Sequence, residues 1–303
     1  MEISPPENQN EPIWTVQKIL NWTTGYLQKQ NCESPRLESE VLLAYARGCQ
    51  RIELYTDFNN PVDEQVRSKM RSLVKRRAQG EPVAYLVGHR EFFSLDFHLV
   101  PGVFIPRPET ETLVLEAVEK LKPIKSPRIL ELCIGSGCIS ISLAVQREDA
   151  EVTAVELHPL AYETTLKNID RHNVSQSVKV LQGNLFDAFG EPPPADSQKY
   201  DLLISNPPYI CTDEIAGLDS DIRDFEPHAA LDGGTDGLDI IRKILEQGPD
   251  YIKPGGWCML EMDPAQISTC LEIAKTSGNW SRCESCKDMN GEERCVILQR
   301  NSN

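Results

Sequence analysis

The sequence contains no apolar run that approaches the roughly 18 residues needed to cross a membrane, so we expect no membrane-spanning segment. Residues 1–12 lack a basic start, an apolar stretch and arginine, which argues against a secretory signal and a transit peptide. The ten cysteines are scattered through a sizeable chain, which fits a reducing compartment. We therefore expect a cytoplasmic protein.

Basic residues are scarce relative to acidic ones. The chain has 31 Lys and Arg against 46 Asp and Glu, for a net charge of -15. A large nucleic-acid footprint normally needs clustered Lys and Arg, so we expect no direct nucleic-acid partner. A basic protein partner stays compatible with this charge.

Signatures of metal and phosphate sites are missing as well. Cys283 and Cys286 form one CxxC pair, but no second pair follows at zinc spacing, so we interpret both as structural thiols. The five histidines form no metal-binding or Ser-His-Asp pattern, and no GK[ST] phosphate loop occurs. We expect no metal site.

The N-terminal part has helical periodicity. Apolar residues recur at helical spacing over about residues 13–27. A second helix should run from Pro35 to a stop at Gly48, and a third should begin after Asp63 as N-cap. The third carries a basic run, which would form a solvated face or meet a partner. We predict a helical domain over residues 1–82.

Residues 83–105 are predicted to form a β-hairpin linker, because aromatic and apolar residues alternate with polar ones from Glu91 to Val100. The segment Pro106–Glu111 then has the proline and acidic residues typical of a helix start.

From Arg128 onward, short apolar runs alternate with helical segments. This alternation predicts an α/β fold with a doubly wound, mostly parallel sheet. Two closing strands joined through Asn290-Gly291 would add an antiparallel edge. The long connection 213–237 is of a length that is usually functional or mobile. Strands are predicted at 128–133, 151–156, 178–182, 200–205, 257–262, 280–287 and 294–299, and helices at 139–146, 159–172, 238–247 and 264–276.

The stretch Ser205-Asn206-Pro207-Pro208-Tyr209 ends one of these strands. Two successive prolines cannot donate to a sheet, so the strand must stop there. Ligands of open α/β sheets bind at the carboxyl ends of strands, which makes this turn a candidate site. On these residues alone, an ordinary strand-ending turn is an equally good interpretation.

A Gly-rich turn follows the first strand and suggests a nucleoside site. Glu131-Leu132-Cys133-Ile134-Gly135-Ser136-Gly137 leads into a helix, and Glu156, at the end of the next strand, can accept hydrogen bonds from ribose hydroxyls. Ser140 replaces the third glycine of a dinucleotide fold, which favours S-adenosylmethionine over NAD or FAD. Glu131 would balance the cationic end of that cofactor. Asn184 and Leu185 would contact the adenine.

The Asn-Pro-Pro-Tyr turn suits methyl transfer to an amide or aromatic amine nitrogen, whose lone pair is delocalised. Asn206 Oδ1 and the Pro207 carbonyl can accept hydrogen bonds from its two N–H groups and favour a pyramidal nitrogen. Tyr209 would pack on the planar group. Proximity and orientation would supply most of the rate.

Several segments together resemble the peptide chain release factor N5-glutamine methyltransferases (the PrmC/HemK family), and the resemblance covers nearly the whole chain. The stretches that carry it are Asn206–Tyr209, Pro106–Glu111, Tyr85–Phe92, Glu226-Pro227 with Ala230-Leu231 and Gly233-Gly234, and Glu261 followed by Gln266.

The resemblance implies a class I S-adenosylmethionine-dependent methyltransferase domain, over residues 106–303, that methylates the glutamine of the GGQ loop in class I release factors. The N-terminal domain would help to recognise this substrate. Asn206, Pro207, Pro208 and Tyr209 are assigned to the glutamine, with Asn206, Pro207 and Tyr209 catalytic. Assigned to the cofactor are Cys133, Ile134, Gly135, Ser136, Gly137, Glu156, Leu185 and, again, Asn206.

Three positions depart from the family pattern. Cys133 replaces a glycine, and we expect its Cβ to be tolerated only if its φ is negative. Asn184 replaces an Asp and Asp263 a Gly. Three alternatives stay open: methylation of a ribosomal-protein glutamine, adenine-N6 methylation of nucleic acid, and an inactive binding module.

Overall fold

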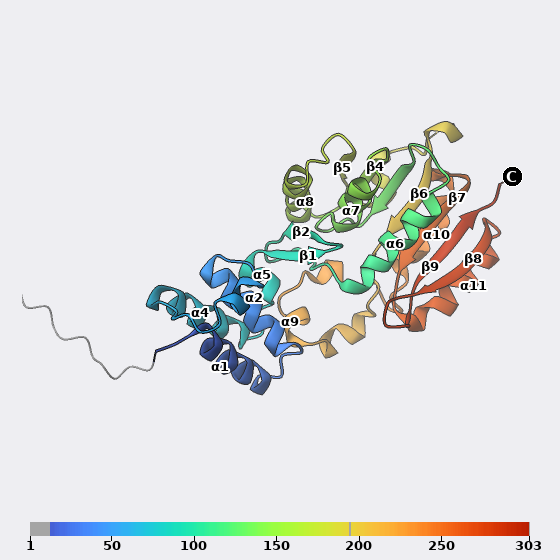
Figure 1. Cartoon of the computed structure of the whole chain (residues 1–303). Coiled ribbons are helices and arrows are strands. Elements are labelled where there is room, and N and C mark those ends of the chain that lie inside the picture. Colours follow the sequence, from blue (N-terminus) through green and yellow to red (C-terminus); the bar gives the residue numbers. More distant parts are fainter. Residues whose placement is uncertain (1–12, 194, 303) are drawn as a thin grey trace, which may run out of the picture. The chain divides into compact units, whose positions relative to one another are not determined.

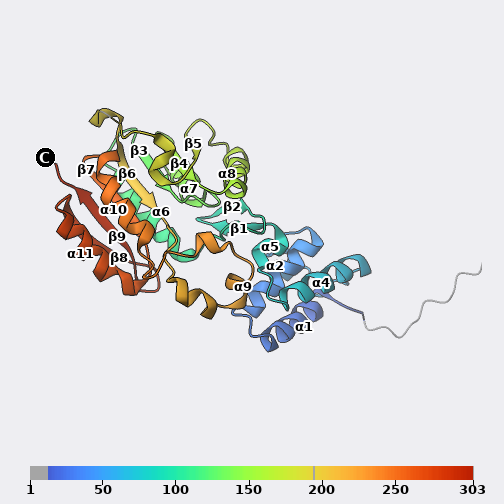
Figure 2. The same cartoon turned by 180° about the vertical axis from the view of Figure 1, so that it is seen from behind.

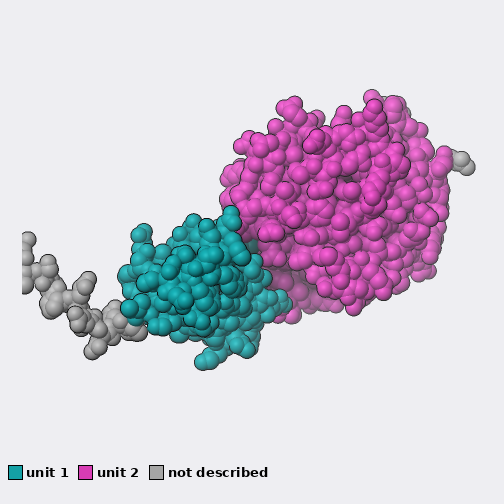
Figure 3. All heavy atoms as spheres, viewed as in Figure 1, with its two compact units in different colours: residues 1–87 teal, residues 88–303 magenta. Residues whose placement is uncertain are grey.

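The computed structural model describes residues 13–193 and 195–302, so the start of the predicted N-terminal domain lies outside the described residues. The chain forms two compact units, one up to Val87 and one from Gly88 onward (Figure 3). Over the described ranges, no helix is both long and apolar enough to cross a membrane.

The first unit is helical, as predicted, and its elements are α1 (Val16–Lys29), α2 (Pro35–Arg47), α3 (Glu53–Thr56), α4 (Glu64–Arg77) and α5 (Val83–Val87) (Figure 1). The Asp63 carboxylate caps α4 by accepting a hydrogen bond from Val66 N at 2.8 Å. Gly48 ends α2 with a φ of 68°, a left-handed conformation that glycine adopts without strain. Leu20, Leu27, Leu42 and Leu43 are among the residues that form its core.

The predicted hairpin linker of residues 83–105 needs one correction. Residues 83–87 are the helix α5 and belong to the first unit, while the hairpin itself is β1 (His89–Phe92) paired antiparallel with β2 (Leu95–His98). Both α3 and α5 were missed because four or five residues are too few to show helical periodicity.

The second unit contains the predicted doubly wound, mostly parallel seven-stranded sheet, with strand order β5-β4-β3-β6-β7-β9-β8. The five neighbouring strands β5, β4, β3, β6 and β7 are mutually parallel. The strand β9 pairs antiparallel with both β7 and β8. Their bounds are β3 Arg128–Leu132, β4 Glu151–Glu156, β5 Val178–Gln182, β6 Tyr200–Ser205, β7 Ile252–Glu261, β8 Trp280–Lys287 and β9 Glu293–Arg300.

Helices cover both faces of this sheet, as Figures 1 and 2 show from opposite sides. Alternate residues of β3 point to different cores: Ile129 packs with α6 (Glu111–Leu121), α7 (Cys138–Gln146) and α8 (Pro159–Arg171), whereas Leu130 packs with α10 (Asp239–Tyr251) and α11 (Ile267–Ser277). Burial on both faces explains why the central strands β3 and β6 are mostly apolar. The carboxyl ends of the parallel strands consequently meet at one edge.

The long connection after β6 is more ordered than its sequence indicates. The short helix α9 (Ser220–Arg223) and the 3₁₀ turns Thr212–Gly217 and His228–Ala230 lie within it. Other 3₁₀ turns cover Pro108–Thr110, Leu185–Phe189, Asp196–Gln198 and Pro264–Gln266.

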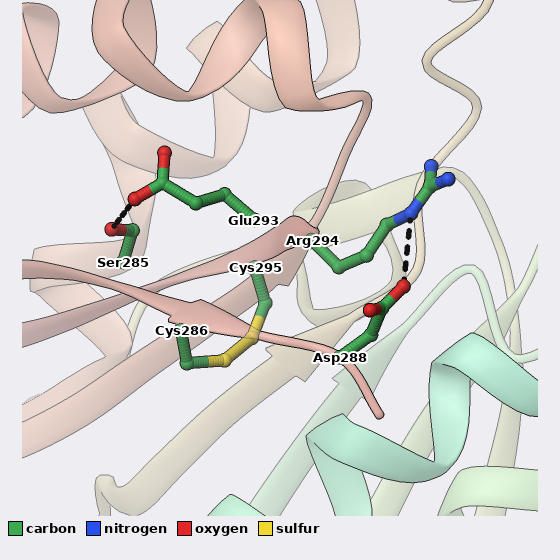
Figure 4. Close-up of a disulfide and its surroundings, with 6 residues drawn as sticks. All are labelled: Ser285, Cys286, Asp288, Glu293, Arg294 and Cys295. Carbon is green, nitrogen blue, oxygen red and sulfur yellow. Dashed lines mark hydrogen bonds and ion pairs between the residues drawn. A yellow bond between two sulfur atoms is a disulfide. The ribbon is translucent and has the colours of Figure 1, made fainter. Parts of the chain in front are cut away.

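The interpretation of Cys286 as a structural thiol needs correction, because it forms a disulfide with Cys295 (Figure 4). The two residues are direct partners in the antiparallel register of β8 and β9, with their Cα atoms 5.3 Å apart. A CxxC spacing shows neighbours along the chain, whereas this pair meets only across a hairpin. Cys283 is a free thiol, as predicted.

Candidate functional site

A cavity of about 380 Å³ lies at the carboxyl ends of the parallel strands in the second unit. The loops after β3, β4, β5 and β6 supply most of its wall, so it occupies the position expected of a ligand site in an open α/β sheet. Of the predicted site residues, those that line it are Glu131, Cys133, Ile134, Gly135, Ser136, Glu156, Asn184, Leu185, Asn206, Pro207, Pro208 and Tyr209.

Gly137, which the sequence also assigned to the cofactor, does not line the cavity. Its φ is 85°, and a Cβ placed on it would lie 2.8 Å from Thr165 Cγ2 of α8. A glycine is required here because α7 begins close against α8. Gly137 therefore positions the loop rather than contacting the cavity.

The loop after β3 is held from behind by polar side chains of α8. Thr165 Oγ1 donates to the Gly135 carbonyl at 2.9 Å, and Asn168 Nδ2 donates to the Ser136 carbonyl at 2.9 Å. Ser136 Oγ is buried and has no hydrogen-bond partner among the described residues. The loop thus presents a rigid backbone and one unsatisfied hydroxyl.

The expectation of a negative φ at Cys133 is wrong, because its φ is 60°. A non-glycine residue in this left-handed region typically costs about 1–3 kcal/mol and persists where the surrounding structure holds it. Burial raises the pKa of the Cys133 thiol to about 12, so the side chain stays a neutral part of the wall.

Glu156 accepts hydrogen bonds from the backbone N–H groups of Gly135 at 2.9 Å and His158 at 2.8 Å. These contacts tie the end of β4 to the Gly-rich loop of β3 and fix the carboxylate at the cavity wall. Burial nevertheless raises its pKa above the ordinary value, because the two donors only partly replace solvent.

Glu131 is the most strongly perturbed acid of the site. It is 1% exposed, and Ser140 Oγ donates to its Oε2 atom. Burial raises the pKa of its carboxyl to about 8, against the opposing effect of Ser140. The nearby Glu156 raises it further. At neutral pH the carboxyl is protonated until a cation approaches.

This shift predicts a pH-dependent stability. In the unfolded chain Glu131 titrates near 4.5, so between this pH and about 8 the folded protein retains a proton that the unfolded chain loses. The stabilisation by this retained proton is complete below pH 4.5 and is lost as the pH rises toward about 8. The slope of melting temperature against pH should become shallower in Glu131→Gln. The matched control is Glu163→Gln, an exposed acid of α8. Parallel wild-type and Glu131→Gln slopes would contradict the prediction.

Hydrogen bonds from three elements fix the Asn206–Tyr209 turn. Asn206 Nδ2 donates to Thr110 Oγ1 at 3.1 Å, which leaves Oδ1 as the atom able to accept from a ligand. Gln266 Nε2 donates to the Tyr209 carbonyl at 2.7 Å. The Tyr209 hydroxyl lies 3.5 Å from Glu261 Oε1, and burial raises the pKa of that hydroxyl.

The connection 213–237 closes over this turn. Ile210 N donates to the Leu231 carbonyl, and Gly233 N donates back to the Ile210 carbonyl, both at 2.9 Å. A Cβ on Gly233 would lie 2.8 Å from the Tyr209 Cα. Gly233 is therefore needed for a close backbone approach.

The Pro106–Glu111 segment is joined to the same connection. Arg107 pairs with the Glu226 carboxylate, whose Oε2 accepts from Ile105 N at 3.1 Å. Arg107 also lies over the Phe104 ring, 4.7 Å from its centroid. These contacts hold Phe104, Pro106 and Thr110, all in the cavity wall, in one arrangement.

Sequence reasoning assigned no role to Thr110, Glu261 or Gln266. Glu261 could have been noticed, because it ends the strand beside that of Asn206. Thr110 and Gln266 stand in segments that carry the family resemblance, but no local pattern indicates their contacts with the distant turn. Over the described ranges, no group of three or more His, Cys, Asp or Glu residues is placed to hold a metal ion.

The site thus combines a buried wall with two carboxyls, which can hold a nucleoside with a cationic group, and a turn of fixed acceptor oxygens, which can hold an N–H donor beside it. Such an arrangement positions an amide or amine nitrogen against a group in the adjoining part of the cavity.

Comparisons with known proteins show which families the chain matches. Residues 18–88 match the family described as the PrmC N-terminal domain, and residues 95–217 match the methyltransferase small domain. Among solved structures, the catalytic domain of hMettl16 in complex with MAT2A 3'UTR hairpin 6 is 16% identical with a TM-score of 0.56. The match covers 76% of this chain and 82% of that one, and it supports the fold alone.

Two relatives are similar over nearly their full length. The release factor glutamine methyltransferase of Rhodopirellula baltica is 40% identical over 298 residues, 97% of this chain and 99% of that protein. That of Geobacter sulfurreducens is 41% identical over 284 residues, 94% of this chain and 96% of that protein. The predicted resemblance is confirmed, and this chain belongs to the release factor glutamine methyltransferase family.

Proposed function

We propose that this enzyme transfers a methyl group from S-adenosylmethionine to the side-chain amide nitrogen of the glutamine in the GGQ motif of class I release factors. The observation that carries the proposal is the Asn206–Tyr209 turn, fixed with its acceptor oxygens in the wall of a cavity of about 380 Å³. Family membership narrows the amide to that of a release factor glutamine.

The residues of the cavity fit S-adenosylmethionine. A Cβ on Gly135 would meet nothing within 4 Å, so the loop leaves room for a ligand against its backbone. Glu131 would lose its proton to become the counter-ion of a cationic group. Each Glu156 oxygen keeps a lone pair for a ribose hydroxyl, and Asn184 and Leu185 would contact the adenine. The unsatisfied Ser136 hydroxyl would gain a partner.

Two acceptors of the chain would activate the substrate nitrogen. Asn206 Oδ1 and the Pro207 carbonyl would accept hydrogen bonds from the two N–H groups and so favour a pyramidal nitrogen with a localised lone pair. The Tyr209 ring would pack on the planar amide. Bound S-adenosylmethionine supplies an electrophilic methyl group. As the nitrogen–carbon bond forms, the bond from the methyl carbon to sulfur would break, and the electron pair of that bond would stay on sulfur. One N–H proton of the product would then leave to water, because burial keeps the Tyr209 hydroxyl protonated and unable to accept it.

The helical first unit would help to hold the release factor, and the protein would act in the cytoplasm, where release factors meet ribosomes. We infer no direct nucleic-acid contact, because the net charge of -15 disfavours one.

The test is a methylation assay with purified full-length protein, S-adenosylmethionine and a class I release factor, read by mass mapping. The expected result is a gain of one methyl on the glutamine of the GGQ peptide. Asn206→Ala protein serves as the inactive control. An unmodified release factor, with methyl found instead on a ribosomal protein or on adenine, would overturn the proposal. Lack of measurable S-adenosylmethionine binding would indicate an inactive binding module.

A further inference from the structure

Two buried side chains contact the acceptor turn, Thr110 at Asn206 and Glu261 at Tyr209. Thr110 closes the 3₁₀ turn Pro108–Thr110, and Glu261 is the last residue of β7; each is 2% exposed. In the parallel register, Ser205 of β6 lies opposite Leu260 of β7, so the next residues along, Asn206 and Glu261, are neighbours at this edge of the sheet.

The Thr110 hydroxyl contacts the Asn206 amide, and the Thr110 side chain also affects the Glu261 carboxyl. The hydroxyl oxygen accepts from Asn206 Nδ2 at 3.1 Å. Burial raises the pKa of the Glu261 carboxyl to about 7, and its interaction with the Thr110 side chain opposes this rise. Glu261 Oε2 is buried and has no hydrogen-bond partner among the described residues, while Oε1 lies 3.5 Å from the Tyr209 hydroxyl. In its ionised form the carboxyl is therefore an acceptor that the Thr110 proton can satisfy.

A side-chain amide can occupy its site in two orientations of nearly equal shape, which differ by exchange of its oxygen and nitrogen. The Thr110 hydroxyl has one proton. If this proton is directed to Glu261, Thr110 can only accept from Asn206, and Asn206 Oδ1 must face the cavity. If the proton is directed to Asn206, the amide turns over and presents N–H groups to the cavity instead.

We propose that Thr110 is a positioning residue which, with Glu261 behind it, fixes the orientation of the Asn206 amide and so makes the site select a glutamine amide over a carboxylate. This inference rests on the proposed function. An outward Oδ1 attracts the N–H groups of glutamine and repels the oxygens of glutamate. A reversed amide would attract a carboxylate and disfavour the reactive orientation of glutamine.

The test compares Thr110→Val, which keeps the shape without the hydroxyl, with Thr110→Ser, which restores it. Glu261→Gln is the second variant. Its amide can donate to Thr110, which would then direct its own proton to Asn206 and reverse the orientation of the Asn206 amide. Thr112→Val, a buried threonine of α6, is the matched control. The readouts are kcat on a GGQ peptide, the ratio of dissociation constants for GGE and GGQ peptides, cofactor affinity and melting temperature.

We expect Thr110→Val and Glu261→Gln to lower kcat on the order of 10- to 100-fold through misorientation of the amide. The GGE/GGQ ratio should fall about tenfold, with cofactor affinity retained. Thr110→Ser and Thr112→Val should resemble the wild type.

An unchanged GGE/GGQ ratio in Thr110→Val would overturn the inference, as would equal weakening of both peptides without rescue by Thr110→Ser, since that pattern is one of packing. Failure of the proposed function is distinguishable, because then the wild-type protein itself would leave the GGQ peptide unmethylated.

Discussion

Replacement of Asn206 by alanine is expected to lower kcat by about 10²–10³-fold while cofactor binding persists at least in part. The variant removes Oδ1, one of the two acceptors for the substrate N–H groups, and removal of one preorganised polar group in an active site typically has an effect of this order. Initial rates on a release factor and direct titration of S-adenosylmethionine measure the two quantities separately.

Asn184→Ala is the informative partner of this variant. Asn184 lines the same cavity but follows β5, on the side that we assign to the adenine. It should weaken cofactor binding and leave kcat at saturating cofactor close to that of the wild type. If Asn206→Ala instead weakened only cofactor affinity and kept its kcat, the acceptor role of Asn206 would be refuted.

Replacement of Gly237 by alanine is expected to lower both activity and stability. A Cβ at this position would overlap the Tyr209 carbonyl and Gln266 Nε2, the two groups whose hydrogen bond fixes the turn. Overpacking of this kind costs about 1–3 kcal/mol, and here relief requires movement of the turn itself. We expect kcat to fall at least about tenfold, since misplacement of reacting groups by 1 Å can cost about 10²-fold.

Gly278→Ala separates this overlap from backbone strain. Gly278 ends α11 with a φ of 70°, nearly the 71° of Gly237, but a Cβ there would meet nothing within 4 Å. Chemical unfolding should therefore show a larger loss for Gly237→Ala than for Gly278→Ala, and only the former should lose activity. Equal effects would mean that backbone conformation, and not contact with the turn, explains the requirement for glycine.

The central strands β3 and β6 were predictable because they are covered on both faces and are consequently mostly apolar. β4, β5 and β6 have the bounds that their apolar runs indicate. The helices α3 and α5 and the order in the connection 213–237 could not be predicted in this way. They depend on contacts with distant segments, such as the pairing of Ile210 with Leu231.

For the site, the sequence by itself determined which residues could take part, because the ends of parallel strands must meet at one edge. Glu131, Glu156, Asn184 and the Asn206–Tyr209 turn follow from this rule, and each lines the cavity. It could not show that Gly137 packs against Thr165 or that Cys133 has a positive φ, since both depend on how the loop meets α8.

Only the tertiary structure decided which atoms of these residues face the cavity. Thr110 is far from Asn206 in sequence, and Gln266 is far from Tyr209, yet their hydrogen bonds orient the amide and the carbonyl of the turn. Amide orientation depends on proton donors and acceptors within about 3 Å. Folding alone brings those partners together, which is why the residues of the turn were predictable and their direction was not.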